Sequence, residues 1–258
     1  MCIRDRDILL VASANPEDYT NRGRIITPLK DRFGAQARTH YPTSIEDEVR
    51  IMEMEHRRFG QEGPEVFTPP YMKEIIAEFT HQARKSPDIN QRSGVSVRIS
   101  IANYETIMSN AVRRAVTLGE PLAVPRITDL PHIYASTASK IELEGFEDAR
   151  EGKIISDLLR KAVTLVFNRY YRVAELEPLV AQFTGNFSVE VSDMMPASSY
   201  VRNAKEIAGL LDATKVVADS ERPEVLASAA EFVLEGLHVN KRLNKTRQDG
   251  QTIYRGQP

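Results

Sequence analysis

The sequence predicts a short α/β segment that passes into an all-helical region, so that the 258-residue chain is mostly α-helical overall. An apolar run without alternation at residues 8–12 is typical of a parallel strand buried on both faces. The stretch "QARTHY", residues 36–41, is rich in β-branched and aromatic residues and predicts a second strand that Pro42 closes. Beyond Pro42 the apolar residues recur at helical spacing only.

The first strand is preceded by a segment that fits no regular structure. The hexapeptide "MCIRDR", residues 1–6, is typical neither of a helix start nor of a strand, and we interpret it as an artefactual leader. A central strand needs neighbours, and if residues 1–6 are such a leader, we expect the chain to be the C-terminal part of something longer. Between the two expected strands we predict a loop at residues 16–23 and a helix at residues 25–33.

The first two helices after Pro42 have start signals. Thr43 or Ser44 can cap a helix from Ile45, with Asp47 or Glu48 near its third position, and its apolar side is Ile45, Val49 and Met52. A second helix follows Pro69-Pro70. Its core-facing stripe is Met72, Ile75, Ile76, Phe79 and Ala83.

A third helix is predicted over residues 96–118, with Gly119 at its C-cap. Its apolar positions are Ile101, Tyr104, Met108, Ala111 and Ala115. A short helix over residues 128–135 tolerates Pro131 if that residue lies in the first turn. A polar connector at residues 136–152 follows.

The remaining chain predicts helices and a basic end. The expected helices are residues 153–171, 174–183, 197–211 and 222–243. Residues 238–258 carry five basic side chains against one acidic side chain, and we interpret them as a solvated tail rather than a nucleic-acid contact.

Composition excludes several classes of protein. The net charge of -2 gives no general attraction to nucleic acid, and no apolar run approaches the roughly 20 residues of a membrane span. A single cysteine, Cys2, excludes an internal disulfide framework and a cysteine-based zinc site. We therefore expect a cytoplasmic protein.

Three polar residues occupy positions that suit a phosphate ligand. Asn15 follows the first expected strand, where ligands lie in open α/β sheets, and its amide can orient a water molecule. Arg32 ends a short helix before Gly34, and Arg98 lies in the first turn of the third helix. Alternatively, Asn15 and the following proline simply start a turn.

The segment "ASANPEDYTNRGRIITPLKDRFGAQARTHYP", residues 12–42, resembles the segment after the Walker B strand in AAA+ ATPases of the magnesium-chelatase I-subunit-like branch, near the MoxR group. Its Asn-Pro-Glu and Leu-x-Asp-Arg-Phe-Gly elements carry the resemblance, which extends over residues 7–139. The resemblance implies the end of a P-loop core at residues 1–43, a helical lid at 44–138 and an additional helical region with the basic tail at 139–258.

The resemblance also implies three roles. Asn15 matches sensor 1, which positions the attacking water, and Arg32 matches the arginine finger, which reaches the nucleotide of a neighbouring subunit. Arg98, in Ser96-Val97-Arg98, matches sensor 2, which reaches the phosphates of its own subunit. The intact protein is then expected to use ATP and Mg²⁺, to form a ring, expected to be a hexamer, and to act on a client or adaptor protein.

Each of these roles has an alternative. Arg32 can instead form a surface ion pair with Asp31, and Arg98 can be an ordinary solvated helix residue. Three other arginines compete for the finger role: Arg22, Arg24 and Arg38. His40 is interpreted as a packed or capping residue rather than a ligand.

The sequence contains no Gly-x-x-x-x-Gly-Lys-Ser/Thr loop, and no apolar run ends in Asp-Glu. Residues 145–154 come nearest but have six residues between the glycines, and Ile154 stands where a hydroxyl is required. The family pattern places both elements upstream, so we expect this chain alone not to hydrolyse ATP. A non-catalytic helical adaptor and a nucleic-acid-associated helical protein are the other hypotheses.

Overall fold

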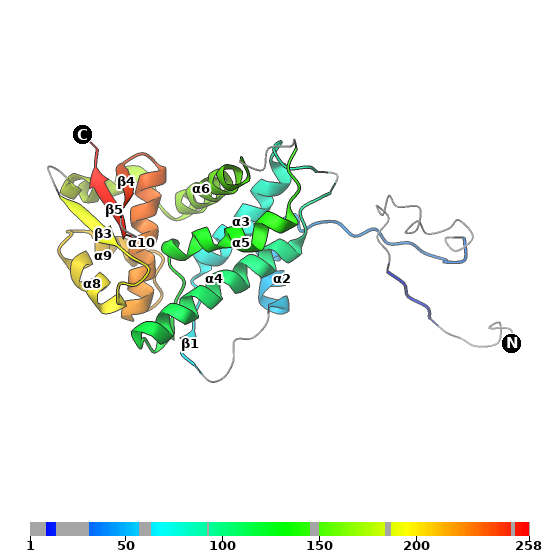
Figure 1. Cartoon of the computed structure of the whole chain (residues 1–258), viewed down its shortest axis with the longest axis horizontal. Helices are drawn as coiled ribbons and strands as arrows, with labels where there is room; N and C mark the ends of the chain where they lie inside the picture. The colour runs from blue at the N-terminus through cyan, green and yellow to red at the C-terminus, as the bar shows by residue number, and fades with distance from the viewer. Residues whose placement is uncertain are drawn as a thin grey trace. The chain divides into compact units, whose positions relative to one another are not determined.

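The computed structural model describes residues 9–13, 31–56, 63–91, 93–144, 150–183, 187–248 and 251–257. The chain divides into two compact units, Met1–His40 and Tyr41–Pro258. The second unit is mostly helical with two small sheets (Figure 1).

The two expected strands of the first unit are not formed by the residues that the structure describes there. Residues 9–13 and 36–40 have no strand geometry, and Leu9, Leu10 and Val11 are exposed. An apolar run becomes a buried strand only when neighbouring strands take up its backbone hydrogen bonds, and no strand in the described part of this unit does so. Most of the helix expected at residues 25–33 lies outside the described residues, and Asp31 and Arg32 lie in a turn.

The first three helices of the second unit confirm the sequence predictions. They are α2 (Ile45–Glu55), α3 (Pro70–Lys85) and α4 (Val97–Leu118). Ser44 caps α2, since its Oγ accepts a hydrogen bond from Asp47 N at 3.0 Å. Gly119 ends α4 with a φ of 68°, in the left-handed region that glycine adopts without strain. All five residues of the stripe predicted for α3 are buried.

The segment after α4 is less regular than expected. It consists of β2 (Leu122–Ala123), which pairs in parallel with β1 (Glu65–Val66), and of η2 (Ile127–His132), α5 (Ile133–Thr137) and η3 (Ala138–Lys140). The prediction of one helix over residues 128–135 with Pro131 in its first turn is wrong, because Pro131 lies inside the 3₁₀ helix η2. The α-helix α5 begins at Ile133, after Pro131, so the missing N–H of this proline removes no hydrogen bond from the α-helix.

The C-terminal half has one long helix at each end of a series of short ones. The elements are α6 (Glu151–Tyr170), η5 (Val173–Leu176), α7 (Glu177–Val180), η6 (Ala181–Phe183), α8 (Ala197–Lys205), α9 (Leu210–Thr214) and α10 (Pro223–Val239). Gly209, with a φ of 86°, separates α8 from α9, which the sequence predicted as one helix.

The basic C-terminal segment is a hairpin rather than a solvated tail. Strands β4 (Leu243–Gln248) and β5 (Gln251–Gly256) pair antiparallel, and β3 (Ser188–Val191) pairs with the other edge of β5. Leu243 and Tyr254 are buried, and Lys245 forms an ion pair with Glu235 on α10 at 2.7 Å. The hairpin buries Leu243 of β4 and the run Thr252, Ile253 and Tyr254 of β5, and this burial outweighs the local basic charge.

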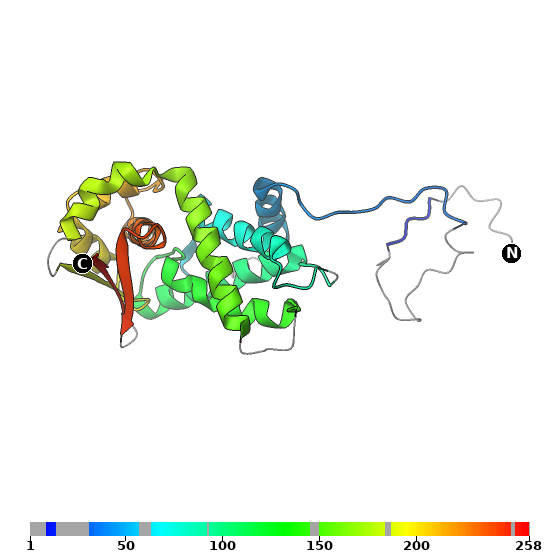
Figure 2. The same cartoon turned by 90° about the horizontal axis from the view of Figure 1, so that it is seen from above.

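The main hydrophobic core extends through the second unit, and α10 lies among the C-terminal elements that pack on it. This helix contacts α6, α8, α9 and β4, and Figure 2 views it nearly end-on between them. The core runs from Met52 to Tyr254, so the boundary expected near residue 139 falls within a shared core. Among the described helices, none has the length and apolar composition needed to cross a membrane.

Candidate functional site

Arg98 lies in the first turn of α4, where its side chain is exposed. Ser96 caps the helix, and its Oγ accepts a hydrogen bond from Arg98 N at 3.2 Å. The guanidinium forms no hydrogen bond or ion pair with any residue that the structure describes, and the first turn of α4 holds no acidic residue. An unpaired guanidinium and the positive end of a helix dipole therefore occupy the same place, which suits an anion.

The loop before Arg98 is held by a buried ion pair between α2 and α3. Both guanidinium Nη atoms of Arg84 donate to the two carboxylate oxygens of Glu48, at 2.7 and 3.0 Å. Arg84 Nε donates to Val95 O at 3.0 Å, three residues before Arg98. The Glu48 side chain is fully buried, so a paired and well-oriented cation is needed to keep it there.

The same carboxylate holds the first turns of α4. Ser100 Oγ donates to Glu48 Oε1 at 2.6 Å and lies 2.7 Å from Thr80 Oγ1 on α3. His81 Nε2 lies 3.5 Å from Glu48 Oε2, and burial lowers the pKa of this imidazole. A neutral His81 leaves Arg84 as the charge that balances Glu48.

Tyr41 covers this pair at the start of the second unit. The Arg84 guanidinium lies over the Tyr41 ring, 4.7 Å from its centroid. Gly94 has a φ of 73°, and a Cβ at this position would collide with the Tyr41 hydroxyl. We define Tyr41, Glu48, Arg84 and Ser100 as the Glu48 network.

The structure places the predicted site residues differently. Asn15 lies outside the described residues. Arg32 is exposed and forms no ion pair in the part of the chain that the structure describes, so the alternative pairing with Asp31 is not formed. Arg32 belongs to the first unit and Arg98 to the second, and the structure does not relate their positions.

Of the arginines that compete with Arg32, the structure describes only Arg38. Arg22 and Arg24 lie outside the described residues, and Arg38 is exposed. The His40 side chain is exposed, so His40 is not a packed residue, and its interpretation as a capping residue stays a prediction.

A second buried charge cluster surrounds Asp129 on η2. Asp129 Oδ1 accepts a hydrogen bond from Arg114 Nη1 at 2.6 Å, and Oδ2 accepts one from Arg126 N at 2.7 Å. Arg126 Nη1 donates in turn to Met195 O at 2.7 Å. This cluster ties α4 and η2 to the start of α8, which makes it a structural connection between the two helical regions.

Glu231 on α10 belongs to the same polar interior. Its Oε2 accepts a hydrogen bond from Thr128 N at 2.9 Å, and burial raises the pKa of its carboxyl group. The pKa is raised although Arg126 and Arg114 oppose the effect of burial. Like the Asp129 cluster, this carboxyl group faces protein on all sides.

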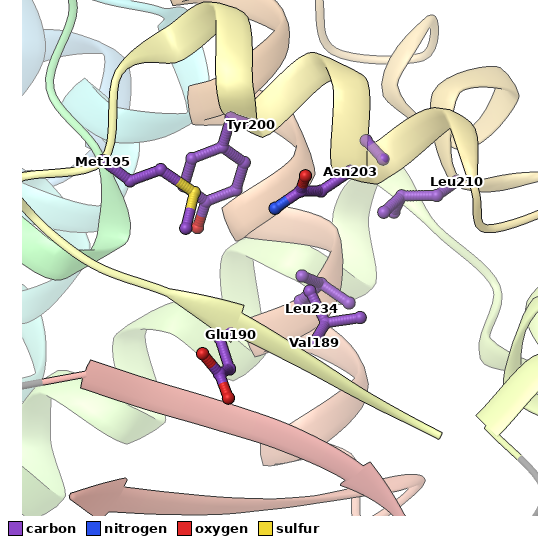
Figure 3. Close-up of a pocket in the computed structure, with 8 residues that line it drawn as sticks. Val189, Glu190, Met195, Tyr200, Asn203, Leu210 and Leu234 are labelled. Carbon is purple, nitrogen blue, oxygen red and sulfur yellow. The ribbon is translucent and has the colours of Figure 1, made fainter.

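A small cavity lies between β3, α8 and α10, next to this cluster. Figure 3 shows Tyr200 and Asn203 on α8 on one side of this space, with Met195 beside the Tyr200 ring, and Glu190, Val189 and Leu234 on the other side. The space suits about one water molecule. It is therefore too small for a cofactor or an organic substrate.

Within the described ranges, no group of three His, Cys, Asp or Glu side chains is arranged to hold a metal ion. Comparisons with protein families, with curated proteins and with solved structures find no match to this chain.

The sequence prediction included Arg98 but missed the Glu48 network. One signal for it was present: Glu48 lies three residues after Ile45 and four before Met52, on the apolar side of α2. A carboxylate on such a stripe must be buried with a partner. The partner, Arg84, lies 36 residues away, and sequence spacing does not identify it.

Proposed function

We propose that this chain is the C-terminal portion of a magnesium-chelatase-like AAA+ ATPase. In this proposal a ring of subunits, of which the expected number is six, couples ATP binding and hydrolysis to remodelling of a partner protein or to metal insertion in the cytoplasm. The observation that carries the proposal is the order of three motifs: Asn-Pro-Glu from Asn15, Leu-x-Asp-Arg-Phe-Gly with Arg32, and Ser-Val-Arg with Arg98. The client protein is left open, because a family resemblance does not define a substrate.

The geometry of Arg98 supports the sensor 2 role. Phosphoryl transfer is stabilised mainly by positioned cations and dipoles, and the ATP phosphates supply the group that is transferred. Arg98 offers a permanently charged donor fork at the capped end of a 22-residue helix, with no protein partner among the described residues to compete for it. The adjoining Glu48 network keeps the start of this helix in a defined place.

Arg32 has the exposure that an arginine finger needs. A finger acts on the nucleotide of another subunit, so it must be accessible and free of a competing carboxylate; Arg32 is exposed and unpaired in the described part of the chain. Its supply in trans makes hydrolysis depend on assembly. The phosphate-binding loop and the magnesium ligands are assigned to sequence upstream of Asp7.

The test uses the protein translated from the complete gene. Arg32→Ala is expected to lower kcat for ATP hydrolysis by about 10³- to 10⁵-fold while nucleotide affinity is retained. Arg38→Ala is tested beside it, because Arg38 is the other described candidate for the finger, and we expect hydrolysis to be retained in that variant. Unchanged hydrolysis in the Arg32 variant would contradict the proposal.

The alternative is a non-catalytic helical adaptor that binds a partner through the second unit. The observation that favours it is the continuous core of Tyr41–Pro258, which includes the C-terminal hairpin. An adaptor requires no catalytic arginine. Partner capture that is unaffected by Arg32→Ala and Arg98→Ala, in a protein without ATPase activity, would favour it.

A further inference from the structure

The Glu48 network contacts the start of α4 both before and after Arg98 in the sequence. Arg84 holds the carbonyl of Val95, three residues before Arg98, and Glu48 holds the hydroxyl of Ser100, two residues after it. Val95 and Ser100 are both fully buried, whereas Arg98 between them is exposed. The exposed arginine therefore projects from a short segment fixed at both ends.

This arrangement does more than fill the interior between α2, α3 and α4. Apolar side chains of similar volume stabilise such an interior at least as well as a buried ion pair, which loses the hydration of both charges. An ion pair instead restricts the orientation of the groups it joins. The planar guanidinium of Arg84 donates two hydrogen bonds to Glu48 and a third to Val95 O. These three bonds define the position of the loop relative to α2 and α3.

Tyr41 extends the network to the beginning of the unit. Its ring covers the Arg84 guanidinium, and its hydroxyl lies against Gly94 in the loop before α4. Any side chain at residue 94 would displace Tyr41 or the loop. Tyr41 is the first residue of the second unit and directly follows the unit that holds Arg32. The network therefore includes the residue at which the chain enters the second unit.

We propose that Arg84, oriented by Glu48, is a positioning residue for Arg98: it fixes the loop and first turn of α4 so that the Arg98 guanidinium meets the nucleotide phosphates in one orientation. This inference rests on the proposed function, in which Arg98 is the phosphate-contacting residue. Displacement of such a group by about 1 Å can lower a rate by about 100-fold.

The first experiment measures ATP hydrolysis in the protein translated from the complete gene. Arg84→Gln and Ser100→Ala are each made in the wild-type chain and in the Arg98→Ala chain, and all variants are compared with Arg98→Ala alone. Ser100→Ala removes one hydroxyl and keeps the ion pair, so it provides a folded variant if Arg84→Gln does not fold. Arg169→Gln is the matched control, because it removes an ion pair of α3 with α6 rather than with the loop.

The expected result is non-additive. Arg84→Gln and Ser100→Ala should lower kcat/KM by about 10- to 100-fold in the wild-type background and have almost no further effect once Arg98 is alanine. Equal losses in both backgrounds would overturn the inference, because the network would then act without Arg98. Unchanged hydrolysis in Arg98→Ala alone would overturn the proposed function and the inference with it.

A second experiment follows backbone hydrogen exchange in the chain itself. Ser100→Ala should increase exchange about tenfold in a peptide covering residues 95–101 and leave α10 unchanged. Unchanged exchange at residues 95–101 would show that the network does not hold this segment, and would overturn the inference independently of ATPase activity.

Discussion

Glu48 shows how a single buried charge determines its surroundings. Its carboxylate is fully buried and is engaged by Arg84, by Ser100 and at longer distance by His81. Loss of Arg84 would leave the buried charge of Glu48 uncompensated, which costs about 3–5 kcal/mol, far more than the loss of an exposed pair. The residues around Glu48 are therefore constrained by its charge as well as by packing.

His81 gives this region a testable pH dependence. Burial lowers the pKa of its imidazole in the folded chain, so below a pH of about 6.5 the unfolded chain binds a proton that the folded chain does not. The stability contributed by neutral His81 is therefore lost as the pH falls from about 6.5 through its lower folded pKa. The loss is at most about 1.4 kcal/mol per pH unit.

Urea unfolding at pH 7.5 and 5.5 measures this effect. The free energy of unfolding should fall less between the two pH values in His81→Gln than in the wild type, and His132→Gln, at an exposed position, should behave as the wild type does. Glu231 has a raised pKa and acts in the opposite direction, but it is present in all three proteins, so the difference reports His81. An identical pH dependence in His81→Gln would contradict the assignment.

At the scale of elements, α10 depends on a close approach at Gly236. A Cβ at this buried glycine would collide with the Phe167 ring of α6. Gly236→Ala should lower the free energy of unfolding by about 1–3 kcal/mol through overpacking, despite the gain of about 1 kcal/mol in helix propensity. Denaturant unfolding provides the measurement.

Gly152→Ala on α6 is the matched control. The nearest atom to its added Cβ is a ring carbon of Tyr134 at 3.7 Å, an ordinary contact. This variant should therefore be as stable as the wild type or more stable, by up to about 1 kcal/mol. The assignment would fail if both alanine variants gained stability.

Sequence reasoning succeeded where one helix carries its own periodic signal. The stripe of α3 and the ends of α4 depend on local spacing and capping, and the structure confirms both. It failed where the structure depends on contacts between segments that are distant in sequence. The β4 and β5 hairpin is stabilised by its contacts with α10 and β3, and its local basic charge led to the prediction of a solvated tail. Sequence reasoning also missed the ion pair between Glu48 and Arg84, because the two residues are 36 positions apart and belong to no common sequence motif.

At the scale of the whole molecule, the two arginines with expected roles at the nucleotide lie in different units of the chain, Arg32 in the first and Arg98 in the second. The second unit has a continuous core, and Arg98 lies in the first turn of α4, directly after the loop in which Arg84 binds the carbonyl of Val95. The first unit carries Arg32 and the Asn-Pro-Glu motif, whose predicted roles require a nucleotide-binding core. We propose that both arginines serve ATP hydrolysis.

The most direct test is to read the contiguous coding sequence upstream of the codon for Asp7. We expect a Gly-x-x-x-x-Gly-Lys-Ser/Thr loop followed by an apolar strand that ends in Asp-Glu, because the phosphates that Arg98 and Arg32 would contact are bound by such a loop. An upstream sequence without this loop, or a reading frame that starts at Met1, would contradict the ATPase assignment and favour the partner-binding adaptor.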